Sequence, residues 1–162
     1  APVRMAYWDG RRLLSVSDAL ARDLPATRRQ MFIAYPSGLQ LWLNDHPREN
    51  WKLRANGTDL ALPPAGWAAW DAKAGLFSYS ALRNGHKADC ITCPSYHYQD
   101  GRGRWFETEA AGADGALAIT RRKDAVEVIR IAGKEKILLR LPRPRPGRTR
   151  VCPVRTPGGR LA

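Results

Sequence analysis

The alternation of apolar and polar residues constrains this chain more than any other feature of its sequence. In the segment Leu39–Asn44, an extended backbone places three leucines on one side and Gln40, Trp42 and Asn44 on the other. A period of two is typical of a β-strand, whereas a helix needs a period of 3.6. Similar segments recur along the chain between turn sequences such as PSG, NGTD, LPPAG and DGRG. The pattern predicts an all-β fold, an antiparallel β-sandwich of jelly-roll type.

Eleven segments have the composition of strands. The segment 125–131 carries apolar residues on both faces, which predicts a bulge or a strand buried on both sides. One helix is expected over residues 13–25, with Ser15 or Ser17 as its N-cap and Pro25 at its end. The expected strands are 31–35, 39–44, 50–54, 66–71, 76–82, 87–92, 95–100, 104–108, 115–121, 125–131 and 136–141.

Length and composition predict a single globular domain. The chain has 162 residues, of which 44% are hydrophobic, enough to build a packed core. We expect a β-sandwich domain over residues 1–141 and an extended tail over residues 142–162. No apolar run approaches the ~18 residues that a membrane span needs, so a membrane is not an expected partner. The N-terminal sequence lacks an initiator Met and a signal-peptide core, and we expect a piece of a longer polypeptide.

The positive charge is concentrated near the C-terminus. The net charge is +12, but residues 140–162 contain seven arginines and no acidic residue, which leaves 20 basic and 15 acidic residues elsewhere. Arginines alternate with prolines in this tail, so it should be extended and solvated, as in a linker. The alternative interpretation is an arm that binds nucleic acid or another polyanion. Its contacts would come from Arg140, Arg143, Arg145, Arg148 and Arg150.

A family resemblance rests on the region that is rich in tryptophan. The pattern of YPSGLQLWLN (35–44), Trp51 and LPPAGW (62–67), followed later by the turn DGRG (100–103), resembles the C-terminal β-sandwich modules of large glycoside hydrolases. Ser37 stands where those modules usually carry Asn. The resemblance implies a non-catalytic accessory domain of a secreted or periplasmic carbohydrate-active enzyme. Its role would be structural or weakly glycan-binding, and its partner would be the catalytic domain of the same polypeptide.

Two groups of residues have the chemistry of a sugar site. Glycans are bound by exposed aromatic rings, with amides, carboxylates and guanidinium groups nearby to bond the hydroxyls. The first group is Trp42 with Gln40 and Asn44. The second group comprises Tyr96, Tyr98, Asp100 and Arg102. The residues of both groups would equally suit an interface with a neighbouring domain, or half-buried positions in the fold.

Other interpretations of these aromatic and charged residues concern only the fold. Trp51, Trp67 and Trp105 are expected in the core, where their large apolar area would stabilise a sandwich. Asp100 and Arg102 are expected to close their own turn through an Asx hydrogen bond and a local ion pair.

The cysteines and histidines allow a metal site as an alternative. His86, Cys90, Cys93 and His97 supply four ligand types that suit zinc, and the Cys90–Cys93 spacing resembles a metal knuckle. If the backbone here is a regular strand, however, the two cysteines point to opposite faces. A Cys90–Cys93 disulfide is the other alternative, and Cys152 would be either a free thiol or a partner for one of the other two cysteines. We expect no metal and no cofactor.

A pair of glutamates is the strongest catalytic candidate. Glycoside hydrolysis needs two carboxyl groups about 5–10 Å apart. Glu107 and Glu109, two residues apart on an expected strand, would share a face near Asp100. Such pairs are common on solvated strand faces. We therefore predict no catalytic residue in this chain.

Overall fold

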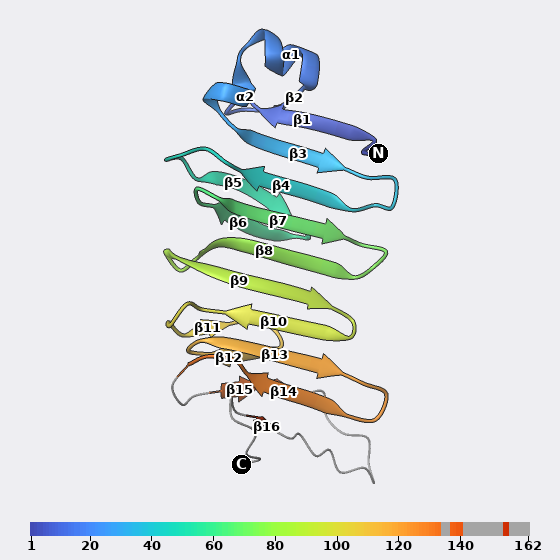
Figure 1. Cartoon of the computed structure of the whole chain (residues 1–162), viewed down its shortest axis with the longest axis vertical. Coiled ribbons are helices and arrows are strands. Elements are labelled where there is room, and N and C mark those ends of the chain that lie inside the picture. The colour runs from blue at the N-terminus through green and yellow to red at the C-terminus, as the bar shows by residue number, and fades with distance from the viewer. Residues whose placement is uncertain (134–136, 141–153, 156–162) are drawn as a thin grey trace. The chain divides into compact units, whose positions relative to one another are not determined.

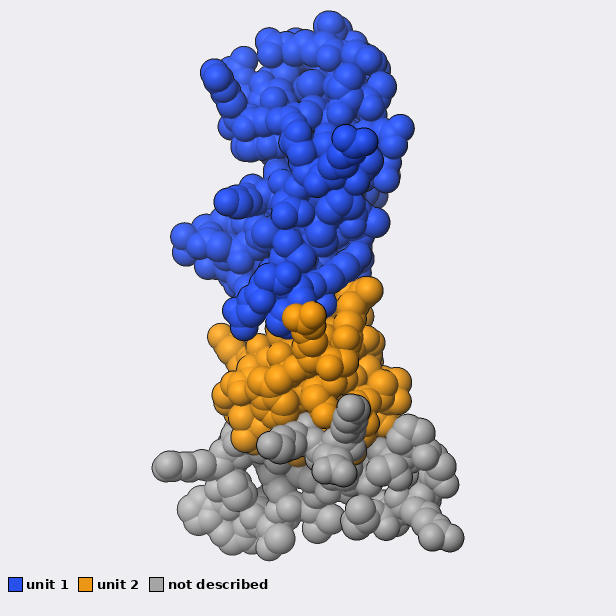
Figure 2. Space-filling view, turned by 90° about the vertical axis from the view of Figure 1, so that its left-hand side faces the viewer, with its two compact units in different colours: residues 1–87 blue, residues 88–162 orange. Residues whose placement is uncertain are grey.

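The computed structural model confirms the all-β, sandwich-like class (Figure 1) and describes residues 1–133, 137–140 and 154–155. Antiparallel strands dominate these residues, together with two short helices. The chain divides into two compact units, residues 1–87 and residues 88–162 (Figure 2). The expected tail, 142–162, lies outside the described residues except for the backbone of 154–155.

Unit 1 is built on an antiparallel sheet whose strands follow one another in the order β2-β1-β3-β4-β7-β8. The hairpin β5–β6 leaves this sheet between β4 and β7, and β6 pairs with β8 only at Ala61 and Leu82. The strands are β1 (Arg4–Trp8), β2 (Leu13–Ser15), β3 (Gln30–Ala34), β4 (Gln40–Asn44), β5 (Trp51–Ala55), β6 (Thr58–Leu62), β7 (Gly66–Asp71) and β8 (Leu76–Arg83).

The helical segment differs in detail from the expected single helix. Its first residues form β2, and two short helices follow, α1 (Val16–Ala21) and α2 (Leu24–Thr27). The Ser15 hydroxyl accepts a hydrogen bond from the Asp18 backbone N–H at 3.2 Å, which confirms Ser15 as an N-cap. Pro25 lies in the first turn of α2, where a proline costs no hydrogen bond, and does not end a helix. Among the described residues, neither helix has the length and apolarity to cross a membrane.

A buried row of side chains crosses the unit 1 sheet. Ala6, Phe32, Trp42, Ala68 and Tyr79 lie next to one another on five consecutive strands, all on one face. All five are buried, and the rings of Phe32 and Trp42 have centroids 5.3 Å apart. This face of the sheet therefore belongs to the core.

The β5–β6 hairpin supplies the second layer of unit 1. It overlies β4, β7 and β8 in Figure 1, and β6 contacts β7 and β8. Trp51 is buried and its ring lies 6.1 Å from that of Trp8, between ring centroids. Leu60 and Leu62 are buried as well. The tight turn of the hairpin places Gly57 at a φ of 71°, which a glycine adopts without strain.

Unit 2 contains two sheets. The larger has the order β9-β10-β13-β14-β16, and the smaller has the order β11-β12-β15. Strand β16 runs parallel to β14, whereas the other pairings are antiparallel. The strands are β9 (His86–Cys93), β10 (Tyr96–Asp100), β11 (Phe106–Glu107), β12 (Ala111–Ala113), β13 (Ala116–Arg121), β14 (Val126–Arg130), β15 (Ile137–Leu139) and β16 (Val154–Arg155).

An aliphatic core joins the two sheets of unit 2. Leu117, Ile119 and Val128 are at most 1% exposed and pack with Ala111 and Ala113 of the smaller sheet. The alanines of β12 have short side chains, so the small sheet can approach the larger one closely. Unit 2 is therefore a two-layer sandwich with a thin core.

Most expected strands are present, with shifted ends. Five strands were not expected, and each is short or lies next to turn residues: β1, β2, β6, β12 and β16. The ladder between β13 and β14 is continuous over 126–130 and shows no bulge. Val126 and Val128 face the core, while Ile129 is half-buried on the other side and Ile131 is exposed. The double apolar pattern thus reflects two faces of one regular strand.

A matched pair of leucines tests the assignment of the unit 1 core. Leu62→Ala should lower the free energy of unfolding by about 2–5 kcal/mol, because Leu62, at the end of β6 in the hairpin, is fully buried. Leu20→Ala, at a residue of α1 that is 63% exposed, should change it by less than ~0.5 kcal/mol. Urea denaturation followed by tryptophan fluorescence measures both values. Equal losses for the two variants would contradict the proposed core.

Candidate functional site

The first expected sugar site is not accessible. Gln40, Trp42 and Asn44 do share one face of β4, as the alternation predicts. Trp42 and Asn44 are buried, however, and Gln40 is half-buried. Their face is the one on which the β5–β6 hairpin returns to the sheet. The expectation of an exposed binding surface at Trp42 and Asn44 is therefore wrong.

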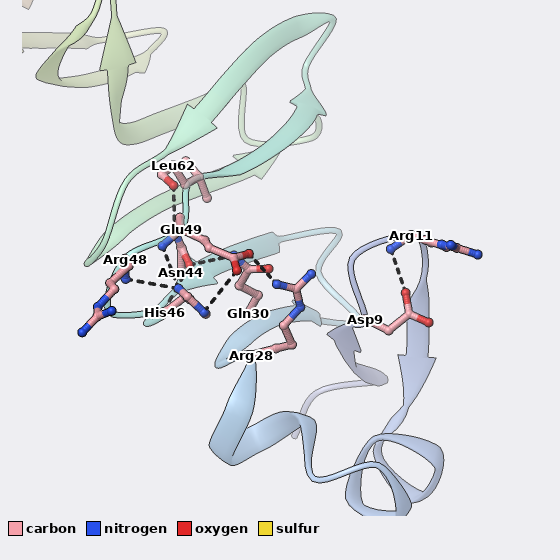
Figure 3. A network of polar contacts seen from close by, with 9 residues as sticks. All are labelled: Asp9, Arg11, Arg28, Gln30, Asn44, His46, Arg48, Glu49 and Leu62. Carbon is pink, nitrogen blue, oxygen red and sulfur yellow. Dashed lines mark hydrogen bonds and ion pairs between the residues drawn. The ribbon is translucent and has the colours of Figure 1, made fainter.

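Asn44 instead has a structural role, which Figure 3 shows. Its Nδ2 donates hydrogen bonds to three backbone carbonyl oxygens, those of Glu49 at 2.8 Å, Leu62 at 2.7 Å and Pro63 at 3.0 Å. Its Oδ1 accepts a hydrogen bond from Gln30 Nε2 at 3.1 Å. One amide thus joins β4 to both the entry and the exit of the hairpin layer.

Charged residues surround this amide without forming a reactive site. Arg28 and Glu49 form an ion pair, and the backbone N–H groups of Arg48 and Glu49 donate to His46 Nδ1 at 3.2 and 2.7 Å. These contacts order the loop between β4 and β5 (Figure 3). Nearby, backbone hydrogen bonds from Arg12 and Arg11 lower the pKa of Asp9, which closes the turn after β1.

The second expected sugar site lies on an open sheet face of unit 2. Tyr96, Tyr98 and Asp100 alternate along β10 with the buried residues His97 and Gln99. They therefore point away from the layer β11-β12-β15, and all three are half-buried. We call this surface the tyrosine face; its members are Tyr96, Tyr98, Asp100, Asp89 and Arg102.

The charged side chains of the tyrosine face hold the turn after β10. Asp100 Oδ1 accepts a hydrogen bond from the Arg102 backbone N–H at 2.7 Å, so the expected Asx turn is confirmed. The Arg102 guanidinium, however, pairs with Asp89, at 2.8 Å between Nη2 and Oδ2, and not with Asp100. Asp89 lies opposite Asp100 in the ladder between β9 and β10. Burial, followed by the charges of Asp100 and Asp89, raises the pKa of Tyr98, so its phenol stays neutral.

On the opposite face of β10, His97 belongs to a buried polar network. Gln99 Nε2 donates to the Phe106 carbonyl at 2.8 Å, so Gln99 Oε1 is left as an acceptor. His97 Nε2 lies 3.1 Å from that oxygen and therefore carries the proton. His97 Nδ1 then accepts from the Thr92 hydroxyl at 2.9 Å. Thr108 also donates to Gln99 Oε1, at 2.9 Å. Burial lowers the pKa of His97 and favours the neutral ring.

The zinc and disulfide alternatives are not supported by this arrangement. Cys90 and Cys93 lie three residues apart on the regular strand β9, so their side chains point to opposite faces. Cys90 is buried and Cys93 is half-buried. Cys90 and His97 share the inner face, but His97 is bonded to Thr92 and Gln99. The described residues contain no group of three or more His, Cys, Asp or Glu side chains that is suited to a metal ion. Cys152 lies outside the described residues.

The three tryptophans that were expected in the core behave differently from one another. Trp51 is buried, which confirms the prediction, and Trp67 is half-buried. Trp105 is 41% exposed, so its assignment to the core is wrong. Its neighbour Phe106 takes the core position instead, with 4% exposure. The alternation of adjacent residues was the signal that could have identified Trp105 as a surface residue.

The expected glutamate pair does not form. Strand β11 ends at Glu107, so Glu109 lies beyond the strand and not beside Glu107 on one strand face. Glu107 forms an ion pair with Arg140, at 2.7 Å between Oε2 and Nη2. Arg140 is therefore engaged with the protein itself, and Arg143, Arg145, Arg148 and Arg150 lie outside the described residues.

Comparison with protein-family models, with curated proteins and with solved structures found no match for this chain. The resemblance to accessory modules of glycoside hydrolases therefore stays a prediction. The tyrosine face is the expected site that the structure leaves accessible.

Substitution of Asn44 tests its structural role. In Asn44→Ala, the carbonyl groups of Leu62 and Pro63 lose a buried donor. We expect a loss of about 1–3 kcal/mol in unfolding free energy for each carbonyl that stays without a partner. Gln40→Ala, on the same strand and face but half-buried, is the matched control and should cost less. Urea denaturation gives both unfolding free energies. A loss for Asn44→Ala no larger than that for Gln40→Ala would disprove the structural role of Asn44.

The buried histidine predicts a pH dependence of stability. The pKa of His97 is lowered in the folded chain, so below its ordinary value of 6.5 the unfolded chain binds more protons. Stability should therefore fall as the pH falls from 7.5 to 5, with a slope of at most about 1.4 kcal/mol per pH unit for one proton. His97→Gln cannot titrate and should show a smaller slope. Urea denaturation at several pH values measures the slope of unfolding free energy against pH. The same slope in His97→Gln as in the wild type would exclude His97 as its cause.

Proposed function

We propose that this chain is a non-catalytic accessory module of a secreted or periplasmic carbohydrate-active enzyme, and that it binds glycan weakly through the tyrosine face. The observation that carries the proposal is the alignment of Tyr96, Tyr98 and Asp100 along one strand, facing away from the core. The sequence resemblance suggests the same class of protein.

The chemistry of the tyrosine face suits a neutral sugar. The two phenol rings offer apolar surface for a pyranose ring and hydroxyl groups for hydrogen bonds. Asp89 and Arg102 form an ion pair that still has carboxylate lone pairs and N–H groups for sugar hydroxyls. A strand places alternate residues about 7 Å apart, so Tyr96 and Tyr98 can contact one extended ligand together.

A second surface supports the idea of an accessory module. On the face of the unit 1 sheet opposite Trp42, Ile33 and Leu41 are neighbours in the ladder, as are Leu43 and Trp67. All four are half-buried, and Met5, beside Ile33, is 40% exposed. We propose that this apolar face packs against the catalytic domain of the same polypeptide.

Binding to polysaccharides tests the proposed function. Affinity electrophoresis in gels that contain xylan, barley β-glucan, glycol chitin or starch should retard the chain in at least one gel. Tyr98→Ala should weaken that binding about tenfold, which corresponds to ~1.4 kcal/mol. Tyr35→Ala, a half-buried tyrosine in the turn after β3 of unit 1, is the matched control and should bind normally.

The salt dependence separates this function from polyanion binding. Glycan binding through neutral rings should be nearly the same at 50 and 300 mM NaCl, whereas binding to poly(dT) would fall steeply. The proposal fails if no polysaccharide retards the chain. It also fails if Tyr96→Ala and Tyr98→Ala both bind like the wild type.

A further inference from the structure

The small sheet of unit 2 has an outer face with its own set of side chains. Glu107, Gly112 and Leu138 are neighbours in register across β11, β12 and β15. The residues that alternate with them, Phe106 and Ala111 among others, face the core. Leu138 is 41% exposed, as expected for the outer side. In Figure 1 these three strands form a layer separate from β10, β13 and β14.

Trp105 is held on this outer face in one orientation. Its Nε1 donates a hydrogen bond to Glu107 Oε1 at 2.7 Å. Its six-membered ring lies against the backbone of Gly112, since a Cβ atom there would come within 2.7 Å of Cζ2. A glycine is therefore required for the ring to lie so close to the strand. The indole has one covered face, yet it remains 41% exposed.

An ion pair borders the indole. Arg140 donates to Glu107 Oε2 at 2.7 Å and also to the Thr108 carbonyl oxygen. Hydrogen bonds from Arg140 and then from Trp105 lower the pKa of Glu107, which keeps it ionised near neutral pH. The pair has no net charge. Its remaining lone pairs and N–H groups can still bond hydroxyl groups.

We propose that Trp105, Glu107 and Arg140 form a second binding site, which takes one pyranose ring of a neutral glycan on the exposed side of the indole. The inference rests on the proposed function for its class of ligand but uses none of the residues of the tyrosine face. A fixed aromatic ring costs little entropy when a ligand binds.

The charge of the site favours a neutral ligand over a nucleic acid. Stacking of a base on Trp105 would bring a phosphate near Glu107, whose carboxylate is ionised. The three proposed residues together have a net charge of zero, so they offer little electrostatic attraction to a polyanion. A sugar ring uses both partners, because its hydroxyls donate to Glu107 and accept from Arg140.

The two proposed sites lie on opposite sides of unit 2. The tyrosine face is on the outer side of the sheet that contains β10, and Trp105 is on the outer side of the sheet that contains β12. The aliphatic core around Leu117 separates the two sheets. One copy of unit 2 would therefore bind two glycan chains at once, one on each side.

Oxidation of Trp105 by N-bromosuccinimide tests this site in the wild-type chain. Peptide mass spectrometry would follow oxidation with and without xylohexaose, cellohexaose, chitohexaose or maltohexaose, each at 10 mM. We expect at least one hexasaccharide to slow the oxidation of Trp105 several-fold. Trp51, which is 3% exposed, should resist oxidation in every sample and serves as the internal control. Absence of protection by all four sugars would overturn the proposal, and so would protection by poly(dT) alone.

Variants separate this inference from the proposed function. Tyr98→Ala should leave the protection of Trp105 unchanged, because the two sites are independent. Glu107→Gln, which keeps the size of the side chain but weakens the pair with Arg140, should reduce the protection at least twofold. If Trp105 is protected but Tyr98→Ala does not affect polysaccharide binding, the tyrosine face fails and the Trp105 site stands. If Tyr98→Ala abolishes both retardation and protection, no independent Trp105 site exists.

Discussion

In each unit, hydrogen bonds from a buried side-chain amide connect the second layer to the main sheet. Asn44 donates to the carbonyl groups at both ends of the β5–β6 hairpin, and Gln99 donates to the Phe106 carbonyl of β11. Neither second layer has a long ladder to the main sheet, so these hydrogen bonds fix where the layer lies. Inside a protein such bonds are costly to leave unmade, which makes the attachment specific as well as stabilising.

The Gln99 contact also determines what the outer face of unit 2 presents. Gln99 bonds the Phe106 carbonyl, and the Phe106 ring lies in the core. Because side chains alternate along a strand, the next residue of β11, Glu107, points outward. Glu107 then orients the indole of Trp105 and pairs with Arg140. The geometry of the exposed tryptophan therefore depends on an amide buried on the other side of the strand. His97 and Thr108, which bond to the same amide, belong to this support.

The sequence pattern identified the strands better than it identified their environment. Alternation correctly grouped Gln40, Trp42 and Asn44 on one face, because the period of a strand is local. It did not show which face would be covered, because that depends on a hairpin about ten residues further along the chain that returns to the sheet. Tyr96, Tyr98 and Asp100 were expected together, and the structure places them on one side of β10, facing away from the core. Their binding of glycan stays a prediction. Trp105 was missed, because residue size favoured the core and the role of Gly112 becomes visible only in three dimensions.

The buried aromatic side chains lie mainly in unit 1, whereas Trp105 of unit 2 is the one aromatic side chain of the described residues that is classed as exposed. In unit 1, Phe32, Trp42 and Tyr79 fill the core and are not available to a ligand. The core of unit 2 consists mainly of alanine, valine, leucine and isoleucine, with Phe106 as its buried ring. Its other large rings stay on the two outer faces, where burial on folding contributes less to stability than in a core. Packing alone gives little reason for a fixed, exposed indole backed by a glycine, whereas a stacking surface needs that arrangement.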